Sequence, residues 1–133
     1  MNVDQIRSDL RALTNGGLIP VLAHAERLRC FWLHPARLLE IRSRLEIRIQ
    51  LDAETVLQPA SIRSGLLARR LLREKAVDYV ASDAHDLSYR RTRMNEAYAR
   101  LTQDYGTCAA GKMMGLNQRD SHGERVKYGY SRG

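Results

Sequence analysis

Cysteines, aromatic residues and long apolar runs are all scarce in this chain of 133 residues, and each scarcity excludes a class of protein. The two cysteines, Cys30 and Cys108, are too few for a disulfide framework or a cysteine-rich zinc site. No apolar run is long enough to cross a bilayer, and no signal-type segment opens the chain. We therefore expect a cytoplasmic protein without a membrane span.

Several catalytic and nucleotide-binding motifs are also missing. The sequence contains no G-x-x-x-x-G-K-[ST] phosphate loop, no G-x-G-x-x-G dinucleotide motif and no G-x-S-x-G nucleophile elbow. A cysteine-based phosphatase needs an arginine six positions after its cysteine, but Ala36 and Met114 occupy those positions after Cys30 and Cys108. Both cysteines are instead predicted to be buried apolar filler.

Basic side chains outnumber acidic ones by 22 to 15, which gives a net charge of +7 and favours anionic partners. Nucleic acid, acidic membrane surfaces and phosphorylated substrates all meet that description. The arginines are spread over several expected helices, and aromatic residues make up only 6% of the chain, without the basic–aromatic interleaving that stacks bases. We therefore expect no nucleic-acid partner, and an ordinary solvated basic surface is an alternative.

Hydrophobic periodicity predicts helices and strands in alternation. Expected helices cover residues 3–15, 35–44, 61–75, 89–105 and 107–115, and expected strands cover residues 18–23, 46–51 and 77–81. The second strand alternates polar and apolar residues, which predicts a half-exposed strand. Three strand–helix units in this order predict an α/β fold with parallel strands. We expect one partial-barrel domain over residues 1–116 and a polar, flexible, disordered tail over 117–133.

Polar side chains follow each expected strand: His24, Glu26 and Arg27 after the first, Gln50 and Asp52 at the end of the second, and Asp83 and His85 after the third. The carboxyl ends of parallel strands meet at one edge of a sheet, where α/β active sites gather. Imidazole and carboxylate ligands suit manganese, iron or zinc, and Arg27 with Arg90 would complete a site for a tetrahedral anion. Ordinary turn, cap and surface roles for these residues are the alternative.

Two separated segments resemble one known family. Residues 17–27, GLIPVLAHAER, are similar to the G-(Y)-I-P-V-L-A-H-P-E-R segment of the CpsB/CapC-type protein-tyrosine phosphatases. Residues 81–85, ASDAH, with Arg90 five positions after His85, resemble the second signature of that family, and residues 49–52 occupy the place of its Q-[IL]-N strand end. These manganese-dependent enzymes belong to the polymerase-and-histidinol-phosphatase (PHP) superfamily and are associated with bacterial capsule and exopolysaccharide synthesis.

The resemblance implies a role for each matched residue. His24, Asp83 and His85 would be metal ligands, and Arg27 and Arg90 would bind the substrate phosphate. The implied reaction is hydrolysis of phosphotyrosine on an autophosphorylated bacterial tyrosine kinase by a manganese-bridged hydroxide. Zinc, iron or magnesium are alternatives to manganese.

The departures from the family pattern shape the remaining expectations. Asp52 stands where the family has asparagine, and no H-x-H or preceding glutamate ligands are found. The resemblance therefore implies the C-terminal half of a PHP-type (β/α)7 distorted TIM-like barrel, with low or no activity alone. Its open sheet edges would suit self-association or a missing N-terminal half. Two other functions stay open, namely a non-catalytic remnant with a basic anion-binding surface and another PHP phosphoesterase, acting on histidinol phosphate or nucleotide phosphates.

Overall fold

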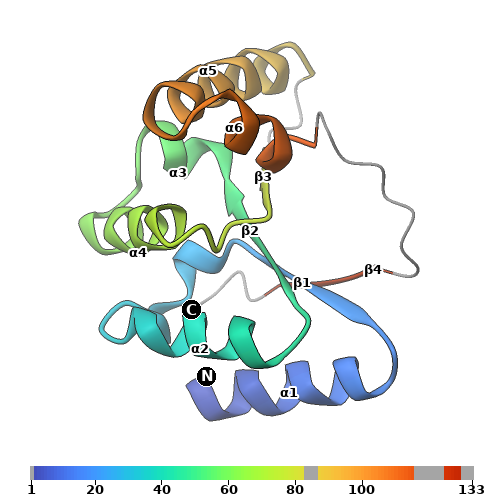
Figure 1. Cartoon of the computed structure of the whole chain (residues 1–133). Coiled ribbons are helices and arrows are strands. Elements are labelled where there is room, and N and C mark those ends of the chain that lie inside the picture. The colour runs from blue at the N-terminus through green and yellow to red at the C-terminus, as the bar shows by residue number, and fades with distance from the viewer. Residues whose placement is uncertain (1, 83–86, 116–124, 130–133) are drawn as a thin grey trace.

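The computed structural model describes residues 2–82, 87–115 and 125–129, which form a mixed α/β structure around one open sheet (Figure 1). Within these ranges the sheet has four strands in the order β3-β2-β1-β4, and all neighbouring strands are parallel. The elements in chain order are α1 (Val3–Asn15), β1 (Ile19–Ala23), η1 (Ala25–Arg27), η2 (Arg29–Phe31), α2 (Pro35–Arg44), β2 (Arg48–Asp52), α3 (Ala53–Leu57), α4 (Ile62–Arg73), β3 (Tyr79–Ala81), α5 (Leu87–Tyr105), α6 (Thr107–Met113) and β4 (Arg125–Gly129).

The predicted fold class is confirmed, because β1, β2 and β3 are parallel and alternate with helices. The predicted half-exposure of the second strand is wrong. Ile49 and Leu51 lie in the hydrophobic core, and Gln50 on the other face is also buried, with 8% of its surface exposed. Met113 of α6 and Met114 just after it line a cavity of about 330 Å³ together with Gln50, so helical segments lie against both faces of β2. The alternation of polar and apolar residues in this strand could not predict that a segment much later in the chain, with Met113 and Met114, would cover its second face.

The structure also differs from the sequence prediction in the segment 117–133, where β4 is found. It pairs with β1 in parallel register, from Ile19 opposite Arg125 to Ala23 opposite Gly129. An unpaired β1 edge would leave a row of backbone N–H and C=O groups open, and β4 supplies partners for them. The rest of the predicted tail lies outside the described residues.

Side-chain caps fix the N-terminal ends of α1 and α4. The Asn2 side chain accepts a hydrogen bond from the Gln5 N–H at 2.8 Å at the start of α1, and Ser61 with Ser64 forms a capping box at the start of α4. Across the described ranges, no helix combines the length and the apolar content that crossing a bilayer requires.

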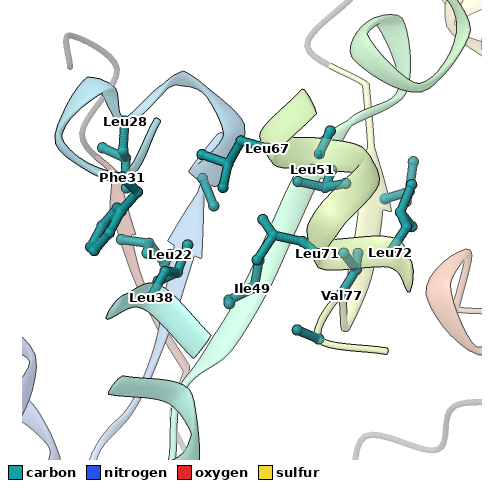
Figure 2. Close-up of a cluster of buried hydrophobic side chains, with 14 of the residues drawn as sticks. Leu22, Leu28, Phe31, Leu38, Ile49, Leu51, Leu67, Leu71, Leu72 and Val77 are labelled. Carbon is teal, nitrogen blue, oxygen red and sulfur yellow. The ribbon is translucent and has the colours of Figure 1, made fainter. Parts of the chain in front are cut away.

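The core joins α4 to the two central strands. Figure 2 shows Leu67 and Leu71 of α4 beside Leu22 of β1 and Ile49 and Leu51 of β2. All five side chains are buried, and each contributes about 1.5–3 kcal/mol when removed from water. This packing gives the carboxyl ends of β1 and β2 a rigid base.

A partly buried carboxylate secures the opposite end of the sheet. Asp78, just before β3, accepts hydrogen bonds from Arg42 Nη2 at 2.9 Å and from the Ile49 N–H at 2.8 Å. The Asp78 N–H in turn donates to the Ile49 carbonyl at 2.9 Å. These bonds fix α2, β2 and the start of β3 to one another.

Candidate functional site

A strained turn ends β1. His24 has φ 53° and ψ 41°, the left-handed region that glycine adopts without strain and other residues adopt at a cost of about 1–3 kcal/mol. The turn leads into η1, where Ala25 and Glu26 are fully buried. Arg27 keeps 42% of its side chain exposed. The backbone therefore presents His24 and Arg27 at the carboxyl end of β1 and directs Glu26 inward.

The segment after this turn is fixed by packing. Leu28 and Phe31 are buried in the hydrophobic core, as Figure 2 shows. The Trp32 Nε1 donates a hydrogen bond to the Glu26 carbonyl at 2.9 Å. Two apolar anchors and this bond hold η1 in place.

Asp52, the last residue of β2, connects three segments at this edge. Its Oδ2 accepts a hydrogen bond from Arg27 Nη2 at 2.7 Å, which forms an ion pair, and lies 4.0 Å from His24 Nδ1. Its Oδ1 accepts from the Glu54 N–H at 3.1 Å and caps α3. Only 2% of the Asp52 side chain is exposed, so the carboxylate is held in a fixed position.

Arg27 is anchored through one nitrogen. Within the described ranges, its guanidinium makes no hydrogen bond except the one to Asp52. The partly exposed guanidinium therefore keeps donors for another group. A guanidinium matches the oxygens of phosphate two at a time, so this arrangement can bind a tetrahedral anion.

Glu26 lies beneath the ion pair. Its Oε2 accepts a hydrogen bond from the Asp52 N–H at 3.1 Å, which ties η1 to the end of β2. Burial raises the pKa of the Glu26 carboxyl above its usual range, and the Asp52 charge raises it further, while the Thr55 hydroxyl and the Asp52 N–H offset part of this rise. Glu26 is thus a positioning group and has no exposed surface for a ligand.

A second ion pair joins α3 to α5 beside this edge. Glu54 Oε2 lies 3.3 Å from Arg93 Nε, and both side chains are partly buried. Arg93 also pairs with Glu96 at 3.2 Å within α5. The position of α5 relative to the end of β2 is therefore fixed by charge as well as by packing.

The structure brings together two of the five site residues predicted from the sequence. His24 and Arg27 both lie beside Asp52 at the carboxyl ends of β1 and β2. Asp83 and His85 lie outside the described residues. Arg90 belongs to α5, and its side chain also lies outside the described part.

The described donors do not fit a metal ion on their own. Among residues 2–82, 87–115 and 125–129, no group of three histidine, cysteine, aspartate or glutamate side chains could hold one. The Asp52 carboxylate is engaged by Arg27 and by the cap of α3, and Glu26 bonds to the Asp52 backbone. A metal at His24 therefore depends on donors beyond the described ranges.

The two cysteines have no place in this site. Burial raises the pKa of the Cys30 thiol above its usual range, in keeping with a partly buried filler. Cys108 is exposed, so the prediction that it is buried is wrong. It stands at the start of the short helix α6, whose buried residues are Ala110, Gly111 and Met113.

From the sequence alone, Asp52 is a polar residue at the end of a strand without an individual role. The signal that could have found this role is local: an aspartate two residues before Glu54, at the point where an apolar strand ends, is typical of a helix N-cap. The ion pair with Arg27, 25 positions away, leaves no such local signal.

The family model described as "Capsular polysaccharide synthesis, CpsB/CapC" matches residues 1–121. The matched range contains the turn at His24, the Arg27–Asp52 ion pair, and the segment with Asp83 and His85.

Proposed function

The chain belongs to the CpsB/CapC family of capsular polysaccharide synthesis, and on that basis we propose that it is a protein-tyrosine phosphatase of low activity. Its substrate would be phosphotyrosine on a bacterial tyrosine kinase of capsule or exopolysaccharide synthesis, and its place of action the cytoplasm. The fold would be part of a PHP-type barrel.

The observation that carries this proposal is the Arg27 guanidinium at the carboxyl ends of β1 and β2. It is fixed by Asp52 at 2.7 Å and keeps donors free of other hydrogen bonds within the described ranges. His24 lies beside the same carboxylate. A phosphate monoester carries the charge and the oxygen geometry that such a guanidinium binds.

We propose manganese as the cofactor, with His24, Asp83 and His85 as ligands and Arg90 as a second phosphate-binding group. Such an ion supplies activated water when bound. The described donors do not hold a metal by themselves, but two residues in place have roles that need no metal. Arg27 would bind and orient the phosphate, and Asp52 fixes Arg27.

We expect the activity to be low because of two features of the site. Its described donors are few, and each missing ligand weakens metal affinity. In addition, the Asp52 carboxylate sits against the guanidinium that would meet a dianionic phosphate. The second candidate function is anion binding without hydrolysis, which the partly exposed Arg27 guanidinium favours because it can bind an oxyanion without a metal.

The test compares the wild type with Arg27→Ala and, as a matched control, Arg37→Ala, which alters an exposed arginine of α2. Hydrolysis of a phosphotyrosine peptide is measured with and without manganese, and orthophosphate binding is measured by calorimetry. We expect slow, manganese-dependent hydrolysis that falls at least about tenfold in Arg27→Ala, since one charge-assisted contact is worth roughly 1.5–3 kcal/mol, and no change in Arg37→Ala.

Two outcomes separate the candidates. Phosphate binding that depends on Arg27 without any hydrolysis would favour the anion-binding function. Phosphate binding that is equal in the wild type and Arg27→Ala would refute both, because Arg27 is the group on which both depend.

A further inference from the structure

A groove lies among the helices α3, α4 and α5. It has a volume of about 680 Å³, and its lining includes the segment between α3 and α4 but none of the residues of the Arg27–Asp52 ion pair. Figure 1 shows α3 between α4 and the end of α5. Val56, Leu57 and Pro59 supply apolar surface in the groove, and Arg69 and Arg100 line it from α4 and α5 respectively.

The arginines of this region have few counter-charges. On α4, Arg70 pairs with Glu74, and on α5, Arg93 pairs with Glu54 and Glu96. By contrast, no carboxylate within the described ranges lies within 4.0 Å of the guanidinium groups of four arginines, namely Arg63, Arg69, Arg73 and Arg100. Asp104 is the acidic side chain of the groove lining. The region therefore carries an excess of positive charge that an anionic partner would offset.

The pKa of the Tyr105 hydroxyl indicates that the side chains of Arg69 and Arg73 lie close to it. The positive charges of Arg69 and Arg73 lower the pKa of its hydroxyl, although burial and Asp104 outweigh them and raise it overall. Tyr105 also lines the groove. Guanidinium groups from two turns of α4 thus lie near the phenol at the end of α5.

The side of α4 that carries Arg69 and Arg73 is apolar near the start of the helix. Ile62 and Leu66, four residues apart, are 83% and 58% exposed, and Arg69 and Arg73 continue this stripe at helical spacing. Exposed large apolar side chains next to a groove are typical of an interaction surface. We call this surface, formed by the groove, Ile62, Leu66, Arg63 and Arg73, the α4–α5 groove.

We propose that the α4–α5 groove binds an acidic peptide segment of a partner protein. The apolar lining would take one or two side chains of that segment, and the arginines along it would pair with its carboxylates. A recessed groove suits a chain with projecting side chains better than the flat face of a bilayer, and its low aromatic content does not suit stacked bases. The proposal does not rest on phosphatase activity, since it uses none of the residues of the site at Arg27.

The test uses a fluorescein-labelled peptide of the sequence Glu-Glu-Leu-Glu-Glu-Tyr-Glu-Glu and fluorescence polarisation. The wild type is compared with the double variant Arg69→Glu and Arg100→Glu. The matched control is Arg11→Glu with Arg37→Glu, which changes the net charge equally on exposed positions of α1 and α2. We expect at least about tenfold weaker binding for the groove variant and at most about twofold for the control, because close charge pairs add affinity and distant charges are screened.

A further arm replaces the exposed apolar pair by Ile62→Ser with Leu66→Ser. We expect this variant to bind the peptide more weakly than the wild type does. The affinity that remains should depend on the salt concentration as it does in the wild type. Urea unfolding of each variant confirms that it folds.

Equal weakening in the groove variant and the control would overturn the proposal, because net charge alone would then explain binding. Phosphatidylserine vesicles and a DNA duplex are measured with the same proteins. If the groove variant loses affinity for either by the same factor as for the peptide, the site is not a peptide groove and the proposal fails.

Discussion

Replacing Asp52 by asparagine should separate the structural role of this carboxylate from its effect on a bound anion. The wild-type carboxylate uses one oxygen for Arg27 and the other for the N–H of Glu54. An amide is uncharged and has only one acceptor oxygen, so Asp52→Asn loses the ion pair in any case and also loses either the hydrogen bond from Arg27 or the cap of α3. The lost cap costs about 0.5–2 kcal/mol, and a lost hydrogen bond to a charged group costs roughly 1.5–3 kcal/mol. We expect the free energy of unfolding to fall by about 1–3 kcal/mol in total.

The same substitution should strengthen phosphate binding. A phosphate on the exposed side of Arg27 would lie roughly 6 Å from the Asp52 carboxylate, where one unit of repulsion costs about 1.4 kcal/mol at an effective dielectric constant near 40. Releasing the Arg27 side chain from its anchor costs only about 0.5–1.5 kcal/mol in ordering upon binding. The charge effect exceeds the ordering cost by up to about 0.9 kcal/mol, so orthophosphate should bind up to about fivefold more tightly to Asp52→Asn than to the wild type.

Asp78→Asn provides the matched control. It also removes one largely buried charge that pairs with an arginine and accepts a backbone N–H. Asp78 binds at Ile49, three residues before Asp52, which is about 10 Å along the strand. That exceeds the screening length of about 8 Å at physiological salt. Urea unfolding should show a loss of stability in both variants, and calorimetry should show tighter phosphate binding in Asp52→Asn alone. Phosphate binding that weakens in Asp52→Asn as much as in Arg27→Ala would refute the reasoning, because Asp52 would then serve only to orient Arg27.

Three further predictions concern other parts of the molecule. The pKa of Glu26 in the folded state is raised above its ordinary value of 4.5. Between these two pKa values the folded state binds more protons than the unfolded state, so the free energy of unfolding falls as the pH rises through the folded pKa. In metal-free buffer, Glu26→Gln should remove this slope and raise the urea midpoint at pH 7; an unchanged slope would contradict the assignment. Iodoacetamide at pH 8 should label the exposed Cys108 before Cys30, whose pKa is raised by burial, as mass spectrometry of digests would show; faster labelling of Cys30 would contradict this order. Deleting residues 116–133 should leave the edge of β1 unpaired and cause self-association, measured by light scattering; a deletion variant that stays monomeric at high concentration would show that β4 does not protect that edge.

The parts of the fold that follow from local pattern could be predicted from the sequence. Helical spacing identified α1, α2 and α4, and short apolar runs identified β1 and β3, because in these segments one face or both faces are buried. The five-residue helix α3 is too short to show a period, and β4 lies in a polar segment whose partner strand is about 100 positions earlier. Neither could be read from its own residues.

Part of the candidate site could likewise be predicted from the sequence and part could not. Ligand-type residues after each strand identified the edge, and His24 and Arg27 lie there. The role of Asp52 depends on the left-handed turn at His24, which brings Arg27 back over the end of β2. No residue pattern between positions 27 and 52 encodes that geometry. Contacts between distant segments are decided by packing, and a single sequence does not contain them in local form.

Among the residues that the structure describes, unfavourable features gather at the carboxyl ends of β1 and β2 and not at the opposite end of the sheet. His24 adopts a left-handed conformation that glycine would adopt without strain, and Glu26 is a fully buried carboxyl. Lys75 also has a positive φ, but it follows the end of α4, where helices commonly terminate in this conformation. At the opposite edge, Asp78 has its oxygens bonded and leaves no comparable strain. A fold selected for stability alone would not retain two such costs only two residues apart, so we propose that function has shaped the carboxyl ends of β1 and β2.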